Sequence, residues 1–178
     1  MSSIFDWHIP RPSDSFPKGA HVTSLDRTDV DLLVALQEDG RRTIKELAAQ
    51  VDLSTSATHE RVRRLTTKGI VSGVHAELDP QQIGVGLQAI IQVRLQRHSR
   101  EAVRAFHDHA LSLPEVVTAT HLTGAVDFLI HVAVRDTDHL RDLALEAFTT
   151  RDEVARLETS IIYEHARAKT WPIYSGPA

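Results

Sequence analysis

Hydroxyl, imidazole and guanidinium side chains are concentrated in residues 54–69. If this stretch is a helix with about 100° between successive residues, Thr58, Val62 and Leu65 lie on one side and can pack inward. The opposite side carries polar residues: Ser56, His59, Glu60, Arg63 and Thr67. Hydroxyls can hydrogen-bond to base edges or phosphates, and arginine can contact guanine or phosphate. The pattern has the chemistry of a DNA-reading helix, although an exposed face with arginines is by itself more often only a solvated face.

Residues at the start of a recognition helix tend to reach the bases. The expected DNA contacts are Ser54, Thr55, Ser56 and His59 in the groove, Arg63 nearby, Arg64 and Lys68 on phosphates, and Thr43 on the DNA backbone. Thr43 is included because a helix N-terminus offers free backbone amides. Arg61 lies about 60° from the packed side, so an ion pair with an acidic residue of the first helix is at least as favoured as a phosphate contact.

Three short helices are predicted in residues 25–69. The first covers about residues 26–37, where apolar side chains recur at helical spacing. The second begins with a capping box formed by Thr43 and Glu46. The third begins at Ser54, a favoured N-cap residue, and ends at Lys68-Gly69, where glycine suits a left-handed terminator. Two short helices joined by a tight turn form a helix-turn-helix.

The C-terminal half combines strands and helices. A weak alternation over residues 70–78 could be a strand or wing, and Asp79-Pro80 marks a domain boundary. The further expected elements are a strand at 87–95, a helix around 102–110, a hairpin of strands 116–123 and 128–134 around Gly124, a helix at 137–149 and a strand at about 157–163. This βαββαβ order predicts a ferredoxin-like sheet with both helices on one face, and hence an α+β protein.

The other face of such a sheet must be covered or polar. Ile90, Leu122, Ile130 and Ile162 suggest apolar side chains on either side of the expected strands. Pairing with a second copy would bury them, because large exposed apolar patches mark association surfaces. We therefore expect a homodimer formed through the C-terminal domain.

Composition excludes several classes of protein. The chain has 178 residues, enough for two small domains, and a formal net charge of −4. Any DNA contact must therefore come from a local patch, and residues 54–69 supply one, with four positive side chains against Glu60. The absence of cysteine excludes disulfides, thiolate catalysis and sulfur-ligated metals. No apolar run is long enough to span a membrane and the first residues do not look like a signal peptide, so we expect a cytoplasmic protein.

No motif points to catalysis or to a cofactor. The chain lacks a Walker loop, a dinucleotide fingerprint and a nucleophile elbow, so we expect neither an enzyme nor a cofactor. Eleven histidines invite a metal site, but their spacing discourages it. His107 and His109 diverge on a helix, and His121 and His131, which could approach each other on the hairpin, have no evident third ligand. The last two are expected to be pH-sensitive sheet or interface residues.

An ordered series of motifs resembles the Lrp/AsnC family of bacterial and archaeal regulators. The series is Leu25-Asp26-Arg27-Thr28-Asp29, Leu36-Gln37-Glu38-Asp39-Gly40-Arg41, Glu46-Leu47-Ala48, Leu53-Ser54, Arg61-Val62-Arg63-Arg64-Leu65, Gly69-Ile70-Val71 and Leu78-Asp79-Pro80 followed by Gly84. It covers about residues 25–168. The resemblance implies a winged helix-turn-helix joined to a βαββαβ amino-acid-sensing domain, dimers that often associate into octamers, and an effector bound between subunits. Asp52, where the family commonly has glycine, and Thr58, at a usually more apolar position, depart from the pattern.

A second mark is the string Thr123-Gly124-Ala125-Val126-Asp127, which resembles the family's Thr-Gly-x-x-Asp hairpin at the effector pocket. The resemblance implies effector contacts at Thr123, Gly124 and Asp127. Glycine lets backbone amides approach a ligand closely, and Asp127 could hold an ammonium group. A glycine hairpin whose aspartate caps the turn would have the same sequence.

The expected organisation is an irregular arm at 1–24, a helix-turn-helix domain with a linker strand at 25–78, an effector-binding and oligomerisation domain at 79–168 and a tail at 169–178. The expected function is sequence-specific regulation of transcription on double-stranded DNA, responsive to an amino acid or related metabolite. Two alternatives stay open: an architectural protein that wraps DNA, and a metabolite-binding or catalytic module whose helix-turn-helix binds protein.

Overall fold

The computed structural model describes residues 24–97 and 99–174, which form two compact units. One unit ends at Ala76 and includes the segment that starts at Arg167, while the other is Glu77–Ala166. All but the last residue of the expected N-terminal arm lies outside the described residues. No helix in the described part of the chain has the length and apolar character needed to cross a membrane.

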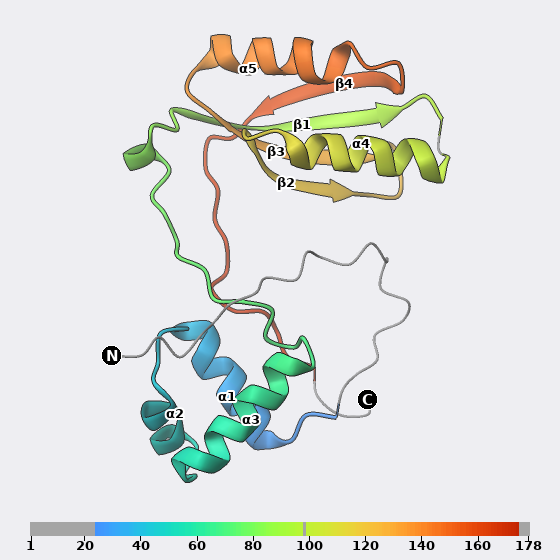
Figure 1. The fold of residues 1–178 in the computed structure, drawn as a ribbon. Helices are drawn as coiled ribbons and strands as arrows, with labels where there is room; N and C mark the ends of the chain where they lie inside the picture. Colours follow the sequence, from blue (N-terminus) through green and yellow to red (C-terminus); the bar gives the residue numbers. More distant parts are fainter. Residues whose placement is uncertain (1–23, 98, 175–178) are drawn as a thin grey trace. The chain divides into compact units, whose positions relative to one another are not determined.

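Three capped helices build the N-terminal unit: α1 (Arg27–Glu38), α2 (Ile44–Gln50) and α3 (Thr55–Thr67) (Figure 1). The predicted capping box is present, with the Thr43 hydroxyl accepting from the Glu46 N–H and the Glu46 carboxylate accepting from the Thr43 N–H. Ser54 caps α3 by accepting from the Ala57 N–H, as predicted. The three caps satisfy backbone donors that helix starts leave free, which explains where these helices begin.

The turn between α2 and α3 depends on a left-handed residue. Asp52 has φ 53°, and it is the one non-glycine residue with positive φ in the described part of the chain. Leu53 then donates its N–H to the Ala48 carbonyl at 3.0 Å, which closes the turn. Aspartate enters this region more readily than most residues, so it can replace the glycine that the turn favours.

The core of this unit is small and apolar. Leu32 and Ala35 of α1, Leu47 of α2 and Val62 of α3 form one buried cluster. Thr58 is also fully buried, and no partner for its hydroxyl is found among the described residues. A buried hydroxyl without a hydrogen bond is destabilising, so this position weakens the anchor of α3.

The strand or wing expected at residues 70–78 is wrong for this structure, which has no strand in that segment. Ile70 and Val71 instead both donate their N–H groups to the Leu65 carbonyl, at 3.0 and 3.3 Å. These bonds complete the end of α3 after Gly69, whose φ is 71°. A strand requires a partner ladder, and none of the described segments provides one here.

The C-terminal unit has the predicted βαββαβ order. Its elements are η1 (Gln81–Ile83), β1 (Leu87–Leu95), α4 (Arg100–Ser112), β2 (Val116–His121), β3 (Phe128–Val134), α5 (Thr137–Leu143), the π-helix η2 (Ala144–Thr149) and β4 (Val154–Ile161). The strands form one sheet in the order β2-β3-β1-β4, with every pair antiparallel (Figure 1). The last strand ends before Tyr163, whose fully exposed side chain corrects the expected boundary.

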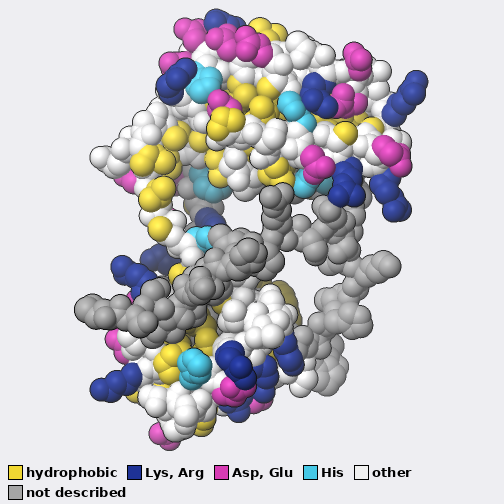
Figure 2. Space-filling model, viewed as in Figure 1, with side chains coloured by type: hydrophobic (Ala, Val, Ile, Leu, Met, Phe, Trp, Pro, Cys, Tyr) yellow, Lys and Arg dark blue, Asp and Glu magenta, His cyan; other side chains and the backbone are white. Residues whose placement is uncertain are grey.

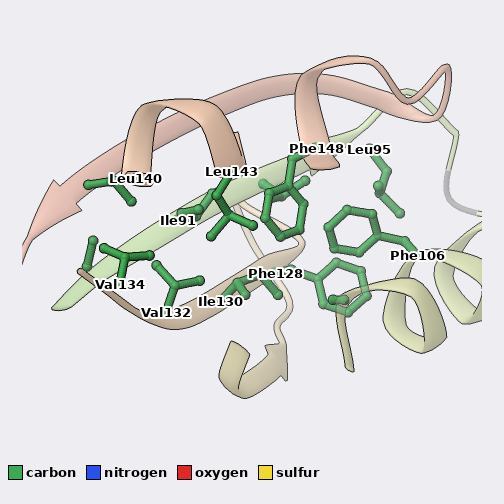
Figure 3. Packing of buried hydrophobic residues seen from close by; sticks show 13 residues of the cluster. Ile91, Leu95, Phe106, Phe128, Ile130, Val132, Val134, Leu140, Leu143 and Phe148 are labelled. Carbon is green, nitrogen blue, oxygen red and sulfur yellow. The ribbon is translucent and has the colours of Figure 1, made fainter. Parts of the chain in front are cut away.

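Both helices cover the same face of the sheet. Phe106 of α4 and Leu143 of α5 join one buried cluster with Ile91 of β1 and Ile130 of β3 (Figure 3). Phe106 lies 4.7 Å from Phe128 and 6.0 Å from Phe148, measured between ring centroids, so three aromatic rings meet at the centre. Of the four apolar residues expected to lie on either side of the strands, Ile130 belongs to this helix-covered core.

The opposite face has no covering helix. The strand register places Ile90 of β1 beside His131 of β3, and Gln92 beside Leu129. Ile90 and Leu129 are partly buried and His131 is buried, with the His165 ring 5.2 Å from the His131 ring, and no helix among the described residues of the unit covers this face. This face therefore carries apolar and polar side chains next to each other.

Replacing Thr58 by valine should stabilise the N-terminal unit, because valine has a similar shape and removes the unpaired buried hydroxyl. We expect the free energy of unfolding to rise by about 1 kcal/mol, as measured by urea denaturation. The matched control is Thr66→Val on the same helix, because the Thr66 hydroxyl donates to the Val62 carbonyl at 3.0 Å. A Thr58→Val protein no more stable than Thr66→Val would show that the Thr58 hydroxyl is satisfied.

Candidate DNA interface and effector hairpin

The polar side of α3 faces outward and its anchoring side faces inward. Thr58, Val62 and Leu65 are the buried residues of the helix. All eight predicted DNA contacts are exposed: Thr43, Ser54, Thr55, Ser56, His59, Arg63, Arg64 and Lys68. Figure 2 shows Lys and Arg side chains beside Asp and Glu on the surface of this unit. The geometry that a DNA-reading helix requires is therefore present, while contact with DNA stays a prediction.

The start of α3 presents hydroxyl groups. The Ser54 Oγ accepts from the Ala57 N–H at 3.2 Å and lies 3.1 Å from the Ser56 Oγ. Capping uses one acceptor position of Ser54, and a hydroxyl has both a donor and a second acceptor position. These serines can therefore hold the helix start and still bind a base edge or a phosphate.

Arg63 is paired with a carboxylate on its own helix. Its Nε and a terminal nitrogen donate to the two oxygens of Glu60 at 3.1 and 3.0 Å. The hydrogen bond from Arg63 lowers the pKa of Glu60. Both side chains are about two-thirds exposed, at 66% and 64%. Because exposed ion pairs are weak, a phosphate or a guanine could replace Glu60 as the partner of Arg63.

Arg61 and Arg64 have a different partner, the buried Asp29 of α1. Arg61 donates to an Asp29 oxygen at 2.8 Å and to Asp26 at 2.6 Å. Arg64 donates to both Asp29 oxygens at 2.8 and 2.7 Å. The ion pair expected for Arg61 is confirmed. The phosphate contact expected for Arg64 stays a prediction, although its guanidinium already has a protein partner.

A surface hollow of about 660 Å³ lies at the start of α2 and is lined by Asp39, Arg41, Arg42, Thr43 and Glu46. The Thr43 N–H and hydroxyl both donate to one Glu46 oxygen, at 2.7 and 2.8 Å. These two hydrogen bonds from Thr43 lower the pKa of Glu46. Thr43 is thus engaged in the capping box, while the Arg41 side chain is 91% exposed and pairs with Asp39 at 3.5 Å.

The glycine hairpin joins β2 to β3. Thr123 and Gly124 are exposed, and Gly124 has φ 125°, which is strained for any other residue. Asp127 is buried, and its Oδ2 accepts the Leu95 N–H at 2.8 Å. One carboxylate oxygen of Asp127 therefore holds the end of β1. This contact supports a structural role for Asp127, one of the two roles that the sequence left open, the other being the binding of an ammonium group.

The two hairpin histidines do not come together, so the expectation that they could approach each other is wrong. In the strand register, His121 pairs with Phe128 and His131 pairs with Thr118. The His121 ring stacks on Phe128 with centroids 4.8 Å apart, on the helix-covered side. The His131 Nε2 lies 2.9 Å from the Gln88 amide oxygen, on the open face. No group of three or more potential metal ligands occurs among the described residues.

Two features of the N-terminal unit were not found from the sequence. The burial of Asp29 could have been suspected, since it is the third helical residue of a capping box with Asp26. The contact of Gln37 with Trp171 could not, because 134 residues separate them. The Gln37 amide donates to the Trp171 carbonyl at 3.4 Å and accepts its N–H at 2.5 Å, which ties the C-terminal segment to α1.

Comparisons with known proteins agree with this geometry. Residues 25–66 match the model of the AsnC-type helix-turn-helix domain, and residues 88–172 match that of the Lrp/AsnC ligand binding domain. The HTH-type transcriptional regulator AldR of Mycolicibacterium smegmatis is 40% identical over 151 residues, covering 85% of this chain and 88% of AldR. The Bkd operon transcriptional regulator of Pseudomonas aeruginosa is 26% identical over 151 residues, covering 85% of this chain and 99% of that protein.

Solved structures are similar over both units. A transcriptional regulator of Neisseria meningitidis in complex with L-methionine has a TM-score of 0.75 and 32% identity, covering 82% of this chain and 94% of that one. Escherichia coli AsnC has a TM-score of 0.75 and 28% identity, covering 84% of this chain and 99% of AsnC.

The pKa of His131 predicts a pH dependence of stability. Burial lowers this pKa, and the nearby charge of His165 lowers it further. The unfolded chain therefore binds a proton more readily than the folded one, so the free energy of unfolding falls as the pH drops below about 6.5. We expect His131→Gln to lose less stability than the wild type between pH 7.5 and 5.5 in chemical denaturation. His165→Gln should give an intermediate loss, and equal losses in all three proteins would contradict the assignment.

Proposed function

Because the chain belongs to the Lrp/AsnC family of DNA-binding transcriptional regulators, we propose that α3 reads a specific DNA sequence and that an amino acid modulates this binding. The observation that carries the proposal is the division of α3 into a buried side and an exposed polar side. A helix of this kind, held by a second helix through a tight turn, can enter the major groove without unfolding its anchor. We propose no catalytic role and no cofactor.

We propose two classes of DNA contact. Ser54, Thr55, Ser56 and His59 would contact bases near the start of α3, where recognition helices approach the groove. Arg63 would contact guanine or phosphate after releasing Glu60, and Lys68 would contact phosphate. Thr43 and Arg41 would face the DNA backbone at the start of α2, where a phosphate would have to compete with Glu46 for Thr43 and with Asp39 for Arg41.

We propose that the C-terminal unit binds an amino acid through Thr123, Gly124 and Asp127. Exposed backbone at Gly124 could approach a carboxylate, and the charge of Asp127 could attract an ammonium group. The L-methionine bound by the Neisseria meningitidis protein supports this class of ligand. One Asp127 oxygen accepts from the Leu95 N–H, so an ammonium group would be held mainly by the charge of this carboxylate.

We propose that the open face of the sheet pairs with a second copy. Ile90, Leu129 and the buried His131 lie on that face without a covering helix. A dimer would place two α3 helices in successive major grooves, about 34 Å apart or a multiple of that distance, and further association into an octamer would add more pairs. A regulator of this kind would work where the DNA is, in the cytoplasm.

Loss of Ser56 and His59 should weaken specific DNA binding more than non-specific binding. We expect Ser56→Ala/His59→Ala to lower affinity for the region upstream of the protein's own gene about tenfold to a hundredfold in a gel-shift assay, because base contacts supply discrimination. Affinity for an unrelated duplex should change less than threefold. Gln82→Ala, an exposed change in the C-terminal unit, serves as control. Wild-type protein that binds both duplexes equally would favour an architectural role.

An amino-acid effector should raise the melting temperature, because a ligand that binds only the native state stabilises it. At a hundred times its Kd the gain is about 2.7 kcal/mol. A thermal-shift screen of the twenty amino acids would identify the ligand. Asp127→Asn should abolish its shift while keeping an acceptor for the Leu95 N–H, whereas Asp152→Asn, on an exposed turn, should keep the shift. If the effector raised the melting temperature of Asp127→Asn as much as that of the wild type, Asp127 would not be an effector-binding residue.

A further inference from the structure

We propose that Asp29 is a positioning residue for DNA recognition, which holds Arg61 and Arg64 on the protein and leaves Arg63 and Lys68 as the phosphate-binding cations of α3. The proposal rests on the proposed function, since it concerns how α3 meets DNA. It reverses the role that the sequence suggests for Arg64. Judged only by its position in the string Arg61-Val62-Arg63-Arg64-Leu65, Arg64 is as well placed to contact a phosphate as Arg63.

Asp29 is a buried carboxylate. Its side chain is only 2% exposed, although it lies in the first turn of α1. Both of its oxygens accept hydrogen bonds from Arg64, and one also accepts from Arg61. The Asp26 N–H completes the set at 3.4 Å. A carboxylate removed from water in this way depends on its protein partners for stabilisation.

The two neighbouring arginines, Arg63 and Arg64, have carboxylate partners that differ in their exposure to water. Arg63 pairs with a carboxylate that is 64% exposed, and water can replace the arginine if it leaves. Arg64 pairs with a carboxylate that water hardly reaches. Moving Arg64 to a phosphate would leave Asp29 with fewer partners in a buried place, which strongly destabilises a folded protein. DNA should therefore recruit Arg63 and leave Arg64 in place.

The contacts of Asp29 also restrain the rotation of α3 about its axis. Arg61 and Arg64 are three residues apart and so project from adjacent positions on the helix. Because both bind one fixed carboxylate on α1, rotation of α3 about its axis would break hydrogen bonds at 2.7 to 2.8 Å. This fixation sets the direction in which Ser56, His59 and Arg63 point. Arg61 also keeps Asp26 as a partner, so it remains paired when Asp29 is changed.

The salt dependence of DNA binding tests the proposal, because each phosphate contact changes the slope of log K against log salt concentration by about 0.9. The experiment compares the full-length variants Arg63→Gln and Arg64→Gln on one duplex selected from a random pool by the wild type. We expect Arg63→Gln to reduce the slope by about 0.9 per DNA-bound copy and Arg64→Gln to leave it unchanged. An equal reduction in Arg64→Gln would overturn the proposal.

Neutralising Asp29 gives the opposite test. Asp29→Asn should release Arg64, which would then contact a phosphate and steepen the slope by about 0.9 per DNA-bound copy. It should also narrow the affinity ratio between the selected and an unrelated duplex. Adding Arg64→Gln to Asp29→Asn should restore the wild-type slope. If Asp29 had only a structural role, the Asp29→Asn substitution would not steepen the salt dependence. An unchanged slope in Asp29→Asn would therefore also contradict the proposal.

The same measurements separate this proposal from the function on which it rests. If folded wild-type protein does not bind any duplex at low salt, the proposed function fails. If the wild type binds and Arg64→Gln behaves like Arg63→Gln, only the role of Asp29 fails. Circular dichroism of each variant establishes folding, and Asp29→Asn/Arg64→Gln remains informative if Arg64→Gln unfolds, because it leaves no unpaired buried carboxylate.

Discussion

The attachment of α3 to α1 is the constraint on which the DNA-facing surface depends. An apolar anchor and a charged anchor act on the same helix. Val62 joins the apolar cluster of α1 and α2, while Asp29 binds two arginines at the edge of that cluster. Apolar packing is not directional, whereas hydrogen bonds to a fixed carboxylate are. The first buries one side of α3 and supplies most of the stability of the unit, and the second restrains rotation of the helix about its axis.

The C-terminal unit applies a different constraint, a sheet with one covered face. Alternate residues of β1 enter the aromatic core, so the residues between them must lie on the other side. That side carries Ile90 and His131, and the depressed pKa of His131 follows from its burial there. A second subunit over this face would bury these groups further. Association and the ionisation of His131 would then be coupled, because both depend on removing this face from water.

Local patterns predicted most of the fold, while long-range contacts limited the prediction of the site. The caps at Thr43 and Ser54 follow from residues within a few positions of each other. The missing strand at residues 70–78 depends on the absence of a partner among the described segments, which periodicity cannot reveal. The different partners of Arg63 and Arg64 could not be predicted from the sequence for a similar reason. Helical position gives the direction of a side chain, but the acceptor that binds it comes from 35 residues earlier.

The acidic character of the chain explains why such arrangements matter for specificity. With a formal net charge of −4, the protein gains little from bulk attraction to DNA. The carboxylates of Asp29 and Glu60, which pair with arginines of α3, reduce the net positive charge around this helix further. Non-specific affinity comes almost entirely from phosphate contacts, whereas discrimination comes from base contacts. A helix that contacts DNA with some of its arginines restrained and with hydroxyls at its start would therefore lose total affinity and gain a larger difference between its own site and the rest of the genome.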